Sequence, residues 1–264
     1  MDSSLNMVIF FSLVGGVFSL IGGVALIASK KNAVRVARYV TPFAAGALLA
    51  AAFVDLLPEA FRSVIELGDH EAIDGAVLGI SAGILIGILG FFLLERAIHW
   101  FHHRGQHSDD KDARVPLIVI GDTVHNFIDG VAIAAAFLVS PTTGIVVTLA
   151  VAAHEIPHEI GDFGLLLGKG LSRGKVLLIN ALSALATTVA AVIFFLLGHS
   201  VEIPLGLVLG ITAGFFVYIA VSDLIPAIHA HEKQRFIGVQ TVMMLIGVIV
   251  VSIATLLLHQ FVGG

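Results

Sequence analysis

Long apolar runs alternate with short polar segments along the whole chain. Eight of these runs are long enough to cross roughly 30 Å of hydrocarbon as helices. They cover residues 7–28, 40–61, 74–97, 116–139, 143–168, 175–198, 203–228 and 236–260. We therefore expect an all-α polytopic membrane protein that forms a single transmembrane domain over residues 1–264.

Composition agrees with this pattern. Hydrophobic residues make up 58% of the chain and charged residues 12%, which excludes a water-soluble domain with a charged surface. The first apolar run has almost nothing before it and is long enough to remain as a span, so we expect no cleavable signal peptide. The chain contains no cysteine, and a metal site built on thiolates is therefore excluded.

The basic residues predict the topology. All of the fourteen lysines and arginines except Arg62 lie in, or at the edges of, the loops that follow spans one, three, five and seven. Because cytoplasmic loops are enriched in lysine and arginine, these four loops are expected in the cytoplasm. An even number of spans then places both termini outside the cytoplasm. The short loops favour a plasma (inner) membrane location.

Two spans carry stripes of polar and ionisable residues. At 100° per residue, the stripe of span four covers an arc of roughly 100°, and that of span five roughly 140°. An ionisable group at membrane depth is costly and marks a functional site by default. The stripes consist of Asp122, His125, Asn126 and Asp129 on span four, and of His154, Glu155, His158, Glu159 and Asp162 on span five.

The two stripes are expected to meet at the middle of the membrane. His125 lies nine residues after Pro116 and His154 eleven after Thr143, each roughly 15 Å along a helix. The short loop SPTT makes the two spans antiparallel neighbours, so that their polar faces can meet. Imidazole and carboxylate together suit zinc, iron or manganese rather than copper(I), which prefers sulfur.

The segment HEIPH, residues 154–158, has a second interpretation. It matches the H-E-x-x-H signature of a zinc metalloprotease, in which His154 and His158 bind zinc and Glu155 is the base. That reading leaves the stripe of span four unexplained. A proton or monovalent-cation carrier is another alternative, although clustered histidine and carboxylate is richer in metal ligands than a proton relay requires. A scaffold without transport gives no reason for so many buried ionisable groups.

A short repeat favours transport over hydrolysis. VDLLPEAF ends span two and SDLIPAIH ends span seven, on opposite sides of the membrane in the topology above. Such a pair is what an inverted repeat of spans one to three and six to eight produces. The repeat makes Asp55 and Glu59 a candidate outer entrance, and it makes Asp223, His229 and His231 a candidate inner exit.

The loop between spans three and four, about residues 99–115, is rich in histidine. His99, His102, His103 and His107 lie there beside three aspartates. The loop is either a mobile cytoplasmic metal-binding segment or a solvated charged linker, because a short histidine-rich tract indicates metal binding by composition alone.

The paired motifs HNFIDG and HEIPHEIGDF, in an eight-span chain with a histidine-bearing third loop, resemble the ZIP family of divalent-metal transporters, in particular the subgroup with H-E-x-P-H-E-x-G-D. The resemblance covers essentially the whole chain. It implies metal movement into the cytoplasm, a 3+2+3 arrangement of helices and commonly a dimer. The implied partners are zinc or other divalent metal ions as substrate, the lipid bilayer and a second copy of the chain, with no nucleic acid and no enzymatic activity.

The resemblance also implies residue roles. His125, Asp129, His154 and His158 match the primary metal site, and Asn126 and Glu155 match ligands of an adjacent second site. Glu159 and Asp162 complete the candidate metal-binding set. Where two-metal members have a further carboxylate on span six, this chain has only the polar residues Asn180, Ser183, Thr187 and Thr188.

Overall fold

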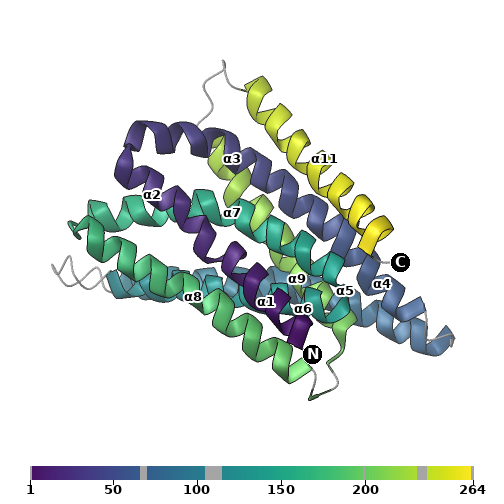
Figure 1. Ribbon diagram of the computed structural model, residues 1–264. Helices are drawn as coiled ribbons and strands as arrows, with labels where there is room; N and C mark the ends of the chain where they lie inside the picture. Colours follow the sequence, from purple (N-terminus) through teal and green to yellow (C-terminus); the bar gives the residue numbers. More distant parts are fainter. Residues whose placement is uncertain are drawn as a thin grey trace.

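The protein is helical throughout the part of the chain that the computed structural model describes. The described residues are 2–65, 70–104, 115–198, 200–201, 203–230 and 237–262. Among them only short turns connect the helices, and they contain no β-strand. The predicted all-α class is therefore confirmed, and Figure 1 shows the helices lying side by side as a bundle.

The first half of the chain forms three long helical runs. In the first, α1 (Asp2–Gly15) and α2 (Ile21–Ala28) are joined by the 3-10 turn η1 (Val17–Leu20). In the second, α3 (Lys30–Ala50), the π-helix η2 (Ala51–Leu56) and α4 (Leu57–Ile65) follow without a break. The third run is α5 (His70–Arg104).

The second half supplies five more runs. They are α6 (Val115–Val139), α7 (Pro141–Gly168) and α8 (Arg173–Gly198), then the continuous run of α9 (Leu205–Tyr218), π-helix η5 (Ile219–Leu224) and α10 (Ile225–Ala230), and finally α11 (Ile237–Val262). Helix α5 continues to Arg104. The predicted start of the histidine-rich loop at about residue 99 is therefore wrong, because residues 99–104 extend the helix of span three.

Seven helical runs within the described residues are long and apolar enough to cross a membrane. They correspond to all of the expected spans except the fifth, α7. That helix has 28 residues, but its ionisable stripe lowers its hydropathy. The chain is thus a polytopic α-helical membrane protein, while the count of eight spans stays a prediction.

Helix α7 lies in the middle of the bundle, where α1, α2, α3, α6, α8 and α11 pack around it (Figure 1). His154, Glu155 and Glu159 are all 1% exposed or less, although each carries an ionisable side chain. Neighbouring helices rather than lipid therefore surround the polar stripe, which is where ionisable residues in membrane proteins belong.

A one-residue turn holds α6 and α7 together. Ser140 is the only non-helical residue between them, and its hydroxyl accepts a hydrogen bond from the backbone N–H of Thr143 at 3.1 Å. Pro141 occupies the first turn of α7, where its missing N–H removes no helical bond. The prediction that SPTT makes the two spans antiparallel neighbours is confirmed.

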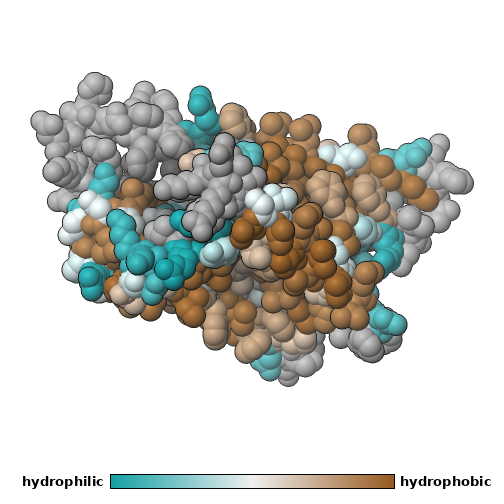
Figure 2. Space-filling view, turned by 90° about the horizontal axis from the view of Figure 1, so that it is seen from above, coloured by the Kyte–Doolittle hydropathy of each residue, from teal (hydrophilic) through white to brown (hydrophobic). Residues whose placement is uncertain are grey.

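The outward-facing residues form an apolar surface. Figure 2 shows a broad hydrophobic region across the middle of the molecule, with hydrophilic side chains gathered towards its two ends. Large exposed side chains on α5, α8 and α11 contribute to the apolar surface, among them Leu78, Leu182 and Leu256, each at least 60% exposed. An apolar belt between polar ends fits a protein whose solvent is the lipid bilayer.

Candidate metal centre

Four ionisable side chains meet between α6 and α7. His125 and Asp129 come from one turn of α6, and His154 and Glu155 are neighbours on α7. One ligand atom of each lies within 4.8 Å of the other three. All four side chains are buried, with His125 the most exposed at 7%. We call these four residues the central cluster.

The separations within the central cluster match a bound metal ion. Two ligand atoms held at about 2.1 Å from a tetrahedral zinc ion lie roughly 3.4 Å apart. The distances between ligand atoms in the central cluster lie on both sides of this value. They are 3.2 Å between the Nε2 atoms of His125 and His154, 3.2 and 3.7 Å from His125 Nε2 to Glu155 Oε1 and Asp129 Oδ2, and 3.3 and 3.6 Å from His154 Nε2 to Asp129 Oδ2 and Glu155 Oε1.

The carboxylates of the central cluster lack hydrogen-bond donors. None of the four oxygens of Asp129 and Glu155 accepts a hydrogen bond from the described residues. A buried carboxylate without compensation is unfavourable by several kcal/mol, so these groups call for a cation. The imidazole of His154 is already oriented for one. Its Nδ1 lies 3.2 Å from the Ala150 carbonyl, which can only accept, so the free lone pair is on Nε2.

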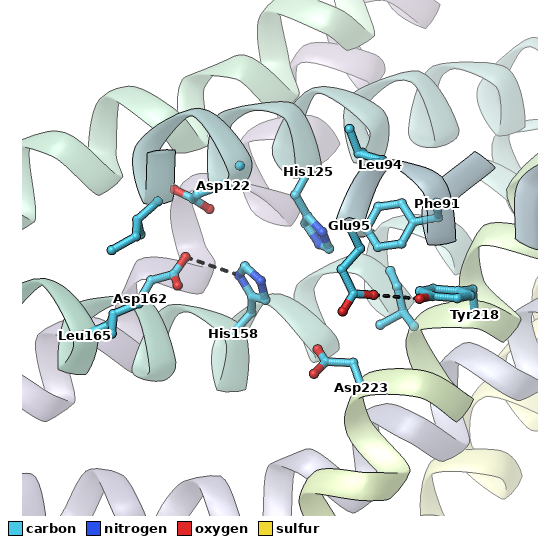
Figure 3. A pocket seen from close by; sticks show the side chains of 13 residues that line it. Phe91, Leu94, Glu95, Asp122, His125, His158, Asp162, Leu165, Tyr218 and Asp223 are labelled. Carbon is cyan, nitrogen blue, oxygen red and sulfur yellow. Dashed lines mark hydrogen bonds and ion pairs between the residues drawn. The ribbon is translucent and has the colours of Figure 1, made fainter. Parts of the chain in front are cut away.

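A second group of ligands lies one helical turn away. His158 and Asp162 of α7 and Asp122 of α6 have ligand atoms within 4.8 Å of one another. Nδ1 of His158 is 3.6 Å from Oδ2 of Asp162. Figure 3 shows the three side chains pointing towards a common space between the two helices. We call these three residues the lower cluster. The structure thus groups Glu155, rather than the expected His158, with His125, Asp129 and His154.

A cavity of about 360 Å³ opens beside the lower cluster (Figure 3). His125 and His158 both line it, so it reaches the edge of the central cluster. The Tyr218 hydroxyl, in another part of the lining, donates a hydrogen bond to Oε2 of Glu95 at 2.6 Å. This bond links the end of α9 to α5. The lining residues are Phe91, Leu94, Glu95, Ile118, Gly121, Asp122, His125, His158, Asp162, Leu165, Tyr218, Ile219 and Asp223.

Asn126 faces α8 rather than the central cluster. Its Nδ2 donates to the backbone carbonyl and to Oδ1 of Asp122, at 3.1 and 2.9 Å, and its Oδ1 accepts from the Thr187 hydroxyl at 2.9 Å. Ser183 of α8 likewise lies 3.0 Å from the hydroxyl of Thr123. Ser183 and Thr187 of span six thus form hydrogen bonds across the α6–α8 contact, whereas the Asn180 amide donates to the Val176 carbonyl within α8.

Glu159 lies outside both clusters, although it belongs to the same stripe of α7. It is fully buried, and neither of its carboxylate oxygens accepts a hydrogen bond from the described residues.

The expected entrance residues lie at the α3–α4 junction. Asp55 is 2% exposed, and its oxygens accept no hydrogen bond within the described part of the chain. Glu59 forms an ion pair with Arg62 at 2.8 Å, and its Oε2 lies 3.9 Å from Nε2 of His259 on α11. The sequence analysis missed His259, because a lone histidine near the end of the last span carries no motif.

The expected exit residues are spread along η5 and α10. Asp223 is exposed and lines the cavity, and His229 is exposed further along α10. His231 lies outside the described residues, as does His107 of the loop. His99, His102 and His103 lie in the last turns of α5. Glu95 and Tyr218, which the sequence analysis did not single out, carry no motif, and only the cavity shows that they lie near the candidate site.

The chain is similar to a known protein family and to individual proteins of that family. A family model described as ZIP zinc transporter matches residues 4–117 and 106–255. The zinc transporter ZIP6 of Homo sapiens is 32% identical over 175 residues, which are 62% of this chain and 23% of that protein. The zinc transporter ZIP4 of Homo sapiens is 44% identical over 111 residues, or 42% and 17%, and ZIP10 of Danio rerio is 40% identical over 130 residues, or 47% and 15%. Each match thus spans under a quarter of the relative's length.

Proposed function

Because the chain belongs to the ZIP zinc transporter family, we propose that it moves zinc or a similar divalent transition-metal ion across a membrane into the cytoplasm. The ion is held at the central cluster, by His125 and His154 with Asp129 and Glu155. Transport, not hydrolysis, is the activity of such a family. The related proteins are named as zinc transporters, which supports zinc as the substrate.

The observation that carries this proposal is the geometry of the central cluster. Five separations between its nitrogen and oxygen atoms lie between 3.2 and 3.7 Å, close to the spacing of ligands around one tetrahedral ion. Two imidazoles and two carboxylates also balance the charge of a divalent cation. The same donor set suits iron(II), manganese and cadmium, so these ions are included as substrates.

The cavity supports a direction of movement. Its lining residues lie in the parts of α5, α6, α7, α9 and η5 that lead to the lysine- and arginine-bearing loops. Those loops are cytoplasmic by their charge, so the central cluster faces the cytoplasm in this conformation. Asp223 and His229 lie along the release route. His231, the next histidine along the sequence after His229, is the remaining candidate for this route.

The proposed entrance carboxylate, on the other side of the central cluster, is buried. Asp55, the proposed entrance carboxylate beside Glu59, is 2% exposed. Loading from that side therefore requires a second arrangement of the helices, as in transport by alternating access.

We also propose the 3+2+3 architecture, in which eight spans form two inverted repeats around α6 and α7. Two structural pairs support it. The π-helices η2 and η5 lie at matching positions, each with the aspartate of the repeated Asp-Leu-x-Pro segment as its fifth residue. Glycines bring α3 against α11, which are spans two and eight, and α5 against α9, which are spans three and seven. The two contacts correspond, because span two matches span seven and span three matches span eight in the repeat. A homodimer in the plasma membrane with both termini outside completes the proposal.

Uptake by purified protein tests the proposal. Liposomes containing a metal-sensitive dye should report influx of zinc, iron(II), manganese or cadmium through the unaltered chain. Asp129→Ala should abolish influx, because it removes a ligand that lipid cannot replace. Gly161→Ala is the control on α7, since an added Cβ there meets nothing within 4 Å. Absence of flux for all four ions would overturn the transport function, and full flux in Asp129→Ala would overturn the assignment of the site.

A further inference from the structure

The lower cluster differs from a set of packing side chains. Nδ1 of His158 lies 3.6 Å from Asp162, too far for a hydrogen bond, and it has no hydrogen-bond partner among the described residues. Asp122 is 5% exposed, and its Oδ1 accepts a hydrogen bond from the amide of Asn126 at 2.9 Å. Three ligand atoms therefore face one another without satisfying one another (Figure 3).

We propose that Asp122, His158 and Asp162 form a second binding site for the divalent ion, which receives it from the central cluster on the way to the cytoplasm. This proposal rests on the transport function proposed above. The site differs from the second site implied by the family resemblance, since Asn126 is occupied by Thr187 and Asp122, and Glu155 belongs to the central cluster.

The chemistry of the lower cluster suits a transient ligand set. One imidazole and two carboxylates offer three protein ligands, and water from the cavity completes the coordination of the ion. His158 and Asp162 are partly exposed, with side chains 26% and 18% accessible, whereas Asp129 and Glu155 are at 0%. A hydrated site with fewer protein ligands binds more weakly, and weak binding allows release.

The two clusters are adjacent along a route. The rings of His125 and His158 stack with their centroids 4.6 Å apart and 10° between their planes. His125 belongs to the central cluster and His158 to the lower one, so the stacked pair forms a shared wall. An ion that leaves the central cluster along this wall reaches Asp162 and Asp122, which line the same cavity as the exposed Asp223.

The absence of cysteine from the chain allows a direct test. Asp162→Cys places a unique thiol at the lower cluster. Leu165→Cys, one turn further along α7 in the same cavity, is the matched control. Cadmium at saturation should slow alkylation of the first thiol by about tenfold or more, because a metal-bound thiolate is not free to react. The rate for Leu165→Cys should change less than about twofold.

Second substitutions separate the two clusters. Protection of Asp162→Cys should disappear with His158→Ala and persist with Asp129→Ala, whose role lies in the central cluster. Asp122→Cys reports from the opposite wall should Asp162→Cys fail to fold. Equal alkylation of both thiols with and without cadmium would overturn the lower site. Protection without metal flux in the unaltered chain would instead refute the transport function and leave the lower site standing.

Discussion

Glu155 is the residue on which the two interpretations of the HEIPH motif differ most. In a protease it would activate water, and its replacement would leave metal affinity largely intact. In this structure its Oε1 lies 3.2 Å from His125 Nε2 and 3.6 Å from His154 Nε2, and for this reason we propose it as a ligand of the ion in the central cluster.

We therefore expect Glu155→Gln to weaken zinc binding by at least about tenfold, because a neutral amide replaces an anionic ligand. Equilibrium dialysis of the purified protein against zinc measures the change. Gly161→Ala on the same helix should bind zinc as the unaltered chain does, since its new Cβ meets nothing within 4 Å. Unchanged affinity in Glu155→Gln would return this residue to a catalytic or purely structural role.

Sequence patterns predicted which faces of α6 and α7 are polar, and they did not predict how those faces divide. Helical periodicity places His154, Glu155 and His158 on one broad arc, but the rotation of α7 against α6 decides which side chain meets Asp129. Neighbours on the chain, His154 and Glu155, both reach the central cluster, whereas His158 lies a turn away. Asn126 turns to α8 because Thr187, remote in sequence, offers it a donor.

At the scale of helices, close packing depends on glycine. A Cβ added to Gly87 of α5 would collide with the Ile211 carbonyl of α9, whereas one added to Gly90 would meet nothing within 4 Å. Helices in membranes associate through such small residues, which let their backbones approach.

Gly87→Ala should destabilise the protein by about 1–3 kcal/mol through overpacking, and its thermal unfolding midpoint in detergent should fall. Gly90→Ala, on the same helix, should leave the midpoint unchanged or raise it slightly, because alanine favours helix by about 1 kcal/mol. Equal midpoints for the two variants would show that the α5–α9 contact is looser than it is here.

The two π-helices were not predicted, although their position was marked. The sequence repeat pairs Asp55 with Asp223 and Pro58 with Pro226. Proline removes a backbone donor and clashes with the preceding turn, which favours a local change of helical winding. The repeat therefore located the irregularity, and only the structure identified it as η2 and η5.

At the scale of the whole molecule, α7 carries a stripe of ionisable residues and is surrounded by other helices. Hydropathy along the sequence predicted eight spans, yet α7 alone among them falls short of the apolar composition of a lipid-facing helix. The reason is that its neighbours are other helices, so its surroundings are set by tertiary packing and not by lipid.

The predicted topology can be tested with two cysteines at opposite ends of α8. Ser172 precedes the helix on the basic side and Ser200 follows it, and both are exposed. In intact right-side-out cells an impermeant thiol reagent should label Ser200→Cys and reach Ser172→Cys only after permeabilisation. The reverse pattern would invert the topology and the proposed direction of transport.

The central claim is that His125, Asp129, His154 and Glu155 hold the transported ion. The most direct measurement is the anomalous scattering of cadmium in crystals of the protein grown with that ion. The expected result is a peak between the Nε2 atoms of His125 and His154, within ligand distance of Asp129 and Glu155. An ordered cadmium peak elsewhere in the protein, with none inside this cluster, would contradict the claim.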